Sequence, residues 1–319
     1  MQTVQNTVTL GIIIPCYNES QVIIHTHTRL HTILQKIVNE NMAKPDSFIT
    51  YVNDGSTDDT QSCLLQIKNS YSNVKIITLS RNFGHQNALF AGLECCMPYA
   101  DVLISMDADL QDDPEAMIEM LKHYYQGIDI VYGVRRSRDK DTFFKKSTAH
   151  MYYKFIRFMG VTIVHDHSDY RLISARALQA LMKHPEINLF LRGLVASIGF
   201  KTSIVYYHRH ERAAGVTKYS IPKMLSFAIE GITSFSVQPL RLVFVAGVLV
   251  SLFSFAMTLF AIISLMFFDV VHGWFSTVLP IYFLGGIQLL SIGILGEYIG
   301  KIYKEVKGRP RYIIQEIID

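Results

Sequence analysis

The chain has 319 residues, of which 50% are hydrophobic and 18% are charged, and its formal net charge is +3. That length suits one large domain or two ordinary ones, and the composition excludes a disordered chain and a nucleic-acid binder that works by bulk charge. Mean hydropathy is +0.22, which indicates a soluble part joined to a membrane part. The four cysteines form no CxxC pair and have no zinc-type spacing, so a reducing compartment is favoured over a disulfide scaffold.

Strands and helices are predicted to alternate in the first half of the chain. The opening residues show no cationic leader and no small-residue cleavage site, so no signal peptide is expected. The apolar run Leu10–Ile14 predicts a buried strand that Pro15 stops. Alternation of this kind predicts an α/β fold with a mostly parallel sheet, helices on both faces and ligands at the carboxyl ends of the strands. The further strands are predicted at Phe48–Asn53, Val74–Leu79, Val102–Met106 and Ile128–Tyr132, and the helices near residues 19–41, 57–69, 84–96 and 114–126.

The composition changes near residue 240. No residue is charged from Leu242 to Phe268 or from Val270 to Gly296, and each stretch exceeds the roughly 20 helical residues that cross a bilayer. The short linker between them predicts an antiparallel transmembrane hairpin. Basic residues flank the hairpin on both sides and are missing from its linker, so the positive-inside rule places both flanks in the cytosol. The expected parts are a cytosolic domain (1–219), an amphipathic membrane-surface helix (220–240), two transmembrane helices (241–300) and a cytosolic tail (301–319).

Carboxylates follow the first two predicted strands. Glu19 comes shortly after the first strand, beside Pro15 and Tyr17, and Asp54 comes directly after the second. A carboxylate at this edge can accept hydrogen bonds from a ribose hydroxyl or a base N–H. Helix capping is the competing interpretation, and it does not explain why Glu19 and Asp54 converge on one edge.

The fourth predicted strand leads into the sequence DADLQDDP. Side chains two residues apart on an extended chain point the same way, so Asp107 and Asp109 can meet one hard cation. Two carboxylates that close are unfavourable unless a cation or protein donors offset them. We therefore expect Mg²⁺ or Mn²⁺ here, bridging the oxygens of a diphosphate.

Basic groups are placed to match such an anion. Arg81 follows the third strand, and Arg135, Arg136 and Arg138 follow the fifth; the sequence leaves open which of these three contacts phosphate. A further basic segment precedes the membrane-surface helix, where an anionic head group would meet it first. It contains Arg209, Arg212, Lys218 and Tyr219. The histidines at 25, 27 and 31 lack the glutamate of an HExxH motif and are interpreted as surface or core residues.

Taken together, the motifs resemble family 2 glycosyltransferases of the GT-A fold, and within them the polyprenyl-phosphate glycosyltransferases, such as dolichol-phosphate mannose synthases and bactoprenol glucosyltransferases. The segments PCYNE, VNDGSTDDT, SRNFGHQNA, DADLQDDPE, SDYRL, RxxGxTKY and LGEYIGKIY occur in the family's order. The resemblance implies three groups of site residues. The nucleotide would be held by Pro15, Tyr17, Glu19, Asp54, Arg81 and Asp107. The metal would be held by Asp107 and Asp109. The diphosphate or acceptor phosphate would be held by Gln111, Arg135, Arg209, Arg212, Lys218 and Tyr219. Asp169 would be the catalytic carboxylate.

The activity that this resemblance implies is inverting transfer of a hexose, most simply glucose from UDP-glucose, to undecaprenyl phosphate. It would occur at the cytosolic face of a bacterial inner membrane, on a homo-oligomer expected to be a tetramer, and would supply cell-envelope or O-antigen glycan modification. N-acetylglucosamine, galactose and modified aminosugars stay open, as does a non-catalytic nucleotide-sugar-binding protein. A processive polysaccharide synthase is disfavoured because the chain has two predicted spans and no QxxRW motif. An acceptor phosphate monoester has a second pKa of about 6, so Asp169 is expected to orient the sugar or the acceptor more than to remove a proton, although the resemblance favours a base.

Overall fold

The computed structural model comprises two compact units. The sheet unit comprises Met1–His150, Ile163–Tyr219 and Arg309–Asp319, and the helical unit comprises Met151–Thr162 and Ser220–Gly308. The residues described within them are 7–135, 167–187, 189, 191–208, 233, 236–267 and 274–319.

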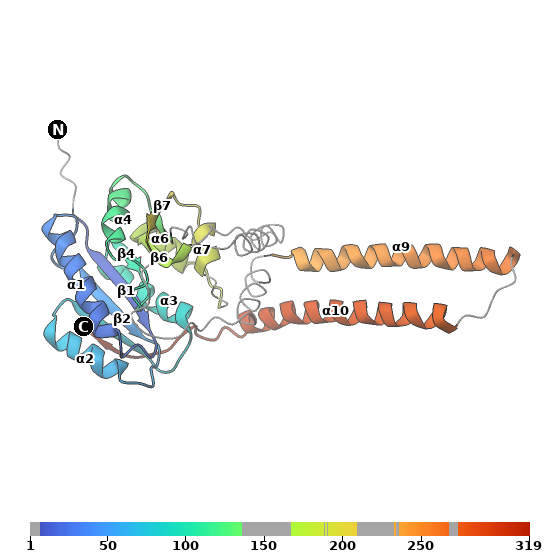
Figure 1. The fold of residues 1–319 in the computed structure, drawn as a ribbon, viewed down its shortest axis with the longest axis horizontal. Helices are drawn as coiled ribbons and strands as arrows, with labels where there is room; N and C mark the ends of the chain where they lie inside the picture. Colours follow the sequence, from blue (N-terminus) through green and yellow to red (C-terminus); the bar gives the residue numbers. More distant parts are fainter. Residues whose placement is uncertain are drawn as a thin grey trace. The chain divides into compact units, whose positions relative to one another are not determined.

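The sheet unit is built on an eight-stranded sheet with the order β7-β5-β6-β4-β1-β2-β3-β8 (Figure 1). Pairing is parallel for β1–β2, β1–β4, β2–β3 and β5–β7, and antiparallel for β4–β6, β5–β6 and β3–β8. The predicted α/β class is therefore confirmed, with a mixed sheet. The strands are β1 (Leu10–Cys16), β2 (Phe48–Asn53), β3 (Val74–Leu79), β4 (Val102–Ser105), β5 (Ile130–Arg135), β6 (His167–Ser174), β7 (Thr202–Tyr207) and β8 (Ile314–Ile318).

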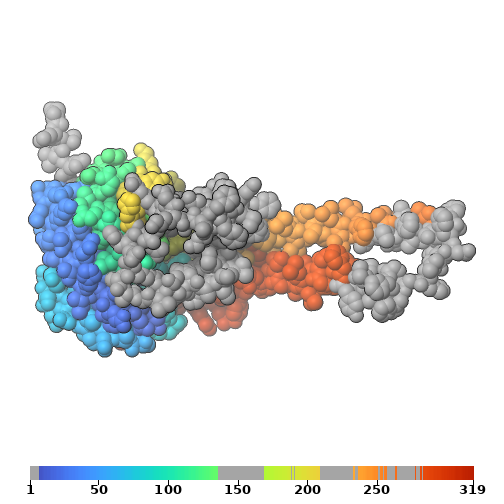
Figure 2. Space-filling model, viewed as in Figure 1, coloured from blue at the N-terminus to red at the C-terminus, as the bar shows by residue number. Residues whose placement is uncertain are grey.

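Helices cover both faces of this sheet. Successive side chains of a strand point to opposite faces, so Ile12 and Ile14 join the core beneath one helical layer while Ile13 faces the other. The first layer holds α1 and α2, which cover the side turned to the viewer in Figure 2. The second layer holds α3, whose Gly92 lies so close to the sheet that an added Cβ would be 2.5 Å from Ile13. The helices of this unit are α1 (Ile23–Asn39), α2 (Thr60–Ser70), α3 (His85–Cys96), α4 (Ala116–Tyr125), α6 (Ala175–Met182) and α7 (Leu191–Ser197), with a 3-10 turn at Met97–Tyr99.

The predicted boundaries of three strands are wrong. β4 ends at Ser105 rather than Met106, and β5 covers Ile130–Arg135 rather than Ile128–Tyr132. β1 does not stop at Pro15 but continues to Cys16, with Pro15 paired to Val52 of β2. Pairing of β1 with β4 ends at Ile13, so from there the strand has a single neighbour. A proline, which lacks the N–H, is tolerated where a strand is paired on one side only.

The helical unit contains two long helices, α9 (Gln238–Phe267) and α10 (Trp274–Val306), which contact each other. Within the described residues, one helical stretch, Phe283–Val306, is long and apolar enough to cross a membrane, and a shorter apolar stretch covers Gln238–Val250. Phe283, Leu289 and Leu290 of this span are 64%, 73% and 67% exposed, as side chains that face lipid would be. The expected membrane-surface helix at 220–240 lies largely outside the described residues.

The end of the chain belongs to the sheet unit. After α10, residues Arg309–Asp319 return to the sheet, where β8 pairs antiparallel with β3. The Tyr312 hydroxyl donates to Glu94 of α3, and the Arg311 guanidinium lies 4.4 Å from the centre of the Phe90 ring. The segment expected as a cytosolic tail thus supplies an edge strand and fastens α3.

Candidate functional site

The predicted site residues meet at one edge of the sheet. β1 to β5 all run in the same direction, so the residues that follow them gather at their common carboxyl edge. β6 runs the opposite way, so its first residues reach the same edge. The described residues placed there are Tyr17, Glu19, Asp54, Arg81, Asp107, Asp109, Arg135 and Asp169.

Asp107 and Asp169 face each other at this edge. The β4–β6 ladder ends with Ser105 opposite Arg171, and two residues further the same register sets Asp107 opposite Asp169. His85, the first residue of α3, lies between them, with its Nε2 3.5 Å from Asp107 Oδ1 and 3.4 Å from Asp169 Oδ2. Burial acts against a charge on this imidazole, but the hydrogen bond to Asp169 and the two carboxylates raise the pKa of His85 to about 9. His85 is therefore a cation that joins the two carboxylates.

Asp169 is held by two arginines as well. Arg171 Nη2 donates to its Oδ1 at 2.6 Å, and Arg192 of α7 reaches its two oxygens at 3.3 and 3.4 Å. Burial favours the neutral acid, yet His85, Arg192 and Arg171 hold the pKa of Asp169 well below its ordinary value. A carboxylate bound in this way is a poor proton acceptor, and its orientation is fixed by its partners.

Asp107 and Asp109 fit a hard cation in part. Apart from the ion-pair contact with His85 at 3.5 Å, Asp107 Oδ1 is buried without a hydrogen-bond partner, while the side chain as a whole is 35% exposed. Burial, followed by the neighbouring carboxylates, raises the pKa of Asp107 to about 6. Asp109 Oδ1 accepts the Gln111 N–H at 3.1 Å, and Leu110 between them has a φ of 54°. This tight turn fixes both carboxylates directly after β4.

A divalent ion here would need further ligands from a substrate. Among the residues that the structure describes, no group of three or more His, Cys, Asp or Glu side chains forms a metal site. Two carboxylates with an orphaned oxygen suit a cation such as Mg²⁺, which binds proteins through one or two carboxylates and substrate phosphates. The residues present therefore fit a metal that arrives with a diphosphate.

Asp54 shapes the neighbouring loop. Its carboxylate accepts the backbone N–H groups of Phe83 at 2.7 Å and Gly84 at 2.9 Å, and only 2% of the residue is exposed. Burial raises its pKa, and the two backbone donors act against that rise. Arg81 is exposed and stacks on Phe83, with its guanidinium carbon 4.0 Å from the ring centre. Asp54 thus holds in place the loop that carries Arg81 and leads into His85.

Arg135 is engaged within the protein. Its Nη2 donates to Asp112 at 3.1 Å, and its Nε donates to the Tyr207 hydroxyl at 3.2 Å. The Arg135 side chain is 30% exposed, against 1% for Asp112. Its position stabilises the segment that follows Asp109, and the exposed part of the side chain faces solvent.

The structure also brings residues to the site that the sequence analysis did not single out: His85, Arg171 and Arg192. Arg171 had a detectable signal, because it is two residues from Asp169 on one strand and so shares its face. Nothing in the pattern around Arg192 marked it. The predicted phosphate-binding residues Arg209, Arg212, Lys218 and Tyr219 lie outside the described residues.

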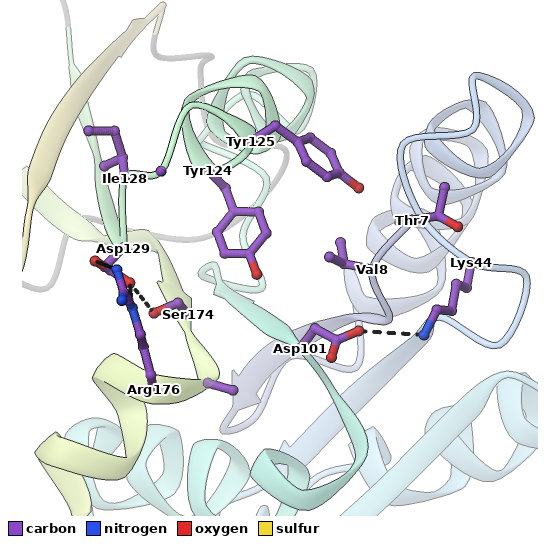
Figure 3. Close-up of a pocket in the computed structure, with 12 residues that line it drawn as sticks. Thr7, Val8, Lys44, Asp101, Tyr124, Tyr125, Ile128, Asp129, Ser174 and Arg176 are labelled. Atoms are coloured by element: carbon purple, nitrogen blue, oxygen red, sulfur yellow. Dashed lines mark hydrogen bonds and ion pairs between the residues drawn. The ribbon is translucent and has the colours of Figure 1, made fainter. Parts of the chain in front are cut away.

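A cavity of about 830 Å³ lies at the opposite edge of the sheet (Figure 3). Its lining includes Asp101 and Asp129, which directly precede β4 and β5, and Tyr124 at the end of α4. Arg176 points at Asp129 in this view and donates to it at 2.5 and 2.6 Å. The cavity is therefore separate from the edge where the candidate site residues gather.

Comparison with known proteins identifies the family. The profile described as "Glycosyl transferase family 2" matches residues 11–182, more than half of the chain, from the second residue of β1 to the end of α6. This protein belongs to glycosyltransferase family 2. The predicted family resemblance and GT-A fold class are thereby confirmed.

Its relatives match almost from end to end. The uncharacterized glycosyltransferase YkoT of Bacillus subtilis is 44% identical over 310 residues, covering 97% of this chain and 92% of that protein. A prophage-derived bactoprenol glucosyl transferase of Shigella flexneri is 37% identical over 311 residues, covering 96% and 97%. Among solved structures, glucosyl-3-phosphoglycerate synthase from Mycobacterium tuberculosis superposes with a TM-score of 0.47 at 16% identity, covering 72% of this chain and 79% of that one.

Proposed function

We propose that this family 2 glycosyltransferase transfers a hexose from a nucleotide diphosphate sugar to a polyprenyl phosphate, with inversion at the anomeric carbon. The observation that carries the proposal is the pairing of Asp107 with Asp169 across His85. One carboxylate belongs to the proposed donor and metal motif, and the other lies among three cations, of which His85 and Arg192 are exposed to an anionic acceptor. The relatives named as bactoprenol glucosyl transferases support a prenyl phosphate acceptor and glucose as the sugar.

On the donor side, the exposed Tyr17 and Arg81, with Pro15, Glu19 and Asp54, are proposed to bind the nucleotide, which we expect to be UDP. Asp107 and Asp109 would hold Mg²⁺ or Mn²⁺, with Gln111 and Arg135 near the diphosphate. When bound there, the ion neutralises the charge of the departing diphosphate.

The transfer requires little proton movement. An oxygen of the acceptor phosphate monoester, dianionic above its second pKa of about 6, forms the new bond to the anomeric carbon. The bond from that carbon to the donor diphosphate breaks, and the diphosphate leaves with the electron pair. The product phosphodiester carries one negative charge, and the nucleoside diphosphate carries one more than in the donor, so charge balances without a base. Asp169, held ionised by Arg171, is proposed to orient the sugar or the acceptor.

For the membrane part, we propose that α9 crosses the bilayer together with the candidate span in α10, and that the sheet unit lies on the cytosolic side of a bacterial inner membrane. This arrangement confines the enzyme to the surface where a prenyl phosphate presents its head group, which raises the local acceptor concentration. A homo-oligomer, expected to be a tetramer, belongs to the same proposal.

The test is transfer of radiolabel from a panel of nucleotide sugars to undecaprenyl phosphate by the full chain in detergent. We expect UDP-glucose to give a labelled lipid, and UDP release to rise when the lipid phosphate is added. A product with N-acetylglucosamine, galactose or an aminosugar would change the sugar and keep the reaction class. Tight UDP binding with no lipid product from any donor would refute the proposal and favour a non-catalytic nucleotide-sugar-binding protein.

A further inference from the structure

Arg192 stands at the candidate site on a fixed backbone. The preceding residue, Leu191, donates its N–H to Gln86 Oε1 of α3 at 3.1 Å. The Leu191 carbonyl accepts a hydrogen bond from Arg171 Nη1 at 3.4 Å. The start of α7 is thus tied both to the helix that begins with His85 and to the strand that carries Asp169.

The two arginines on Asp169 differ in exposure. The Arg171 side chain is 2% exposed, and its contact at 2.6 Å suffices to compensate the single negative charge of Asp169. The Arg192 side chain is 41% exposed and makes longer contacts, at 3.3 and 3.4 Å, with the same carboxylate. Asp169 is only 9% exposed, so the solvent side of this cluster is formed by Arg192 and by His85, which is 44% exposed, rather than by the carboxylate.

This arrangement solves an electrostatic problem. A dianionic phosphate is repelled by a bare carboxylate, yet the proposed reaction needs both at one site. Arg171 removes the repulsion from within, and an exposed guanidinium beside it can bind the phosphate from outside with its planar set of donors. His85 is also exposed, at 44%, but it bridges Asp169 to Asp107, whereas Arg192 contacts Asp169 from the α7 side.

We propose that Arg192 binds the phosphate of the acceptor, a phosphate monoester dianion, directly beside Asp169. This inference rests on the proposed function and deepens it by assigning a residue to the acceptor. It places the acceptor phosphate on the α7 side of Asp169, opposite the donor carboxylate Asp107.

The experiment compares R192Q and R192K with the wild-type chain and with R176Q, all full length in detergent. Arg176 is a matched control, since it also pairs with an aspartate, Asp129, but lies at the opposite edge of the sheet. Four quantities are measured: the KM for a short-chain prenyl phosphate, kcat, the Kd of UDP, and the rise in unfolding temperature that the prenyl phosphate produces without any donor. The last reports binding independently of turnover.

We expect R192Q to raise the prenyl phosphate KM roughly 10- to 100-fold, the loss typical of a charge-assisted hydrogen bond, and to abolish the thermal shift. R192K should recover part of the KM and part of the thermal shift, because lysine restores the positive charge without the planar guanidinium donors. The Kd of UDP should stay within about twofold of wild type, which also shows that the site is folded. R176Q should behave as wild type.

Four results would overturn the inference, and the first is an R192Q variant that matches wild type in both prenyl phosphate KM and thermal shift. A fall in kcat with an unchanged prenyl phosphate KM would mean that Arg192 only positions Asp169. A weaker Kd for UDP with an unchanged prenyl phosphate KM would assign Arg192 to the donor diphosphate. An equal loss in R176Q would reduce the effect to overall charge. If wild type itself neither uses the prenyl phosphate nor is stabilised by it, the proposed function fails. That outcome differs from a functional wild type with an unaffected R192Q, which refutes only the role of Arg192.

Discussion

Gly55 offers a sharp test of how the site's loops pack. It follows Asp54 with a φ of +62°, and a Cβ built on it would lie 2.4 Å from the carbonyl carbon of Arg81 and 2.7 Å from Asn82 N. Both neighbours are backbone atoms, so no side-chain rotation can relieve the contact. Alanine at this position must push away the loop that Asp54 holds through the N–H groups of Phe83 and Gly84.

The magnitude follows from a matched control. Gly127 also has a positive φ, +84°, but nothing lies within 4 Å of its added Cβ. An alanine in the left-handed region costs about 1–2 kcal/mol, which is all that G127A should lose. Overpacking adds about 1–3 kcal/mol, so G55A should lose about 2–5 kcal/mol. For a domain of this size 1 kcal/mol shifts the midpoint by roughly 2–4 °C, which places G55A roughly 2–12 °C below G127A.

Thermal unfolding can be followed with a thiol-reactive dye. Cys16 of β1 and Cys96 of α3 are 3% and 2% exposed, so they become reactive when the sheet unit opens. The variants are compared as full chains in one detergent, and the Kd of UDP is measured for each. G55A should weaken UDP binding and G127A should not. Equal unfolding temperatures for the two variants would refute the packing argument, because the backbone strain is common to both.

Three further predictions concern single residues. D169N should lower kcat at least about 100-fold while the Kd of UDP stays within about twofold, since the loss of an orienting carboxylate acts on the transition state; full activity would remove Asp169 from the site. Chelation of divalent ions should weaken UDP binding roughly tenfold, and D107N should abolish that dependence, because Asp107 supplies a hard oxygen ligand; a Kd insensitive to chelator would argue against the metal. His27 is 2% exposed, and burial lowers its pKa to about 4 from 6.5. Its contribution to the free energy of unfolding is therefore fully present above pH 6.5. As the pH decreases from 6.5 towards 4, that contribution is lost, by up to about 3 kcal/mol. Unfolding midpoints between pH 7 and about 4 should therefore drop less steeply for H27Q than for wild type; parallel curves would contradict this reasoning.

The central strands could be predicted because they are buried on both faces. Such strands read as continuous apolar runs, and Phe48–Asn53 and Val74–Leu79 match β2 and β3 residue for residue. β6 escaped prediction because it carries Asp169 and Arg171, two charged residues that pair with each other in the core. β7 and β8 are edge strands with exposed side chains, and their short patterns resemble loops.

The candidate site was predictable where chemistry and spacing coincide in a short segment. Asp107 and Asp109 lie two residues apart after an apolar strand, which is a local signal. The partners of Asp169 are set by tertiary structure. His85 comes from the start of α3, far earlier in the chain, and Arg192 comes from α7, more than 20 residues after Asp169. Single-residue contacts of this kind leave no periodic pattern in a sequence.

The return of the chain to its first unit sets an order of events during biosynthesis. β3 precedes both long helices in the chain, but its outer neighbour β8 follows them. Until β8 has emerged from the ribosome, the hydrogen-bonding groups along the outer side of β3 stay open, which is a hazard for aggregation. The nascent enzyme therefore finishes its sheet only once the hydrophobic helices have left the exit tunnel, and a chain that stops before Arg309 would keep that side uncovered.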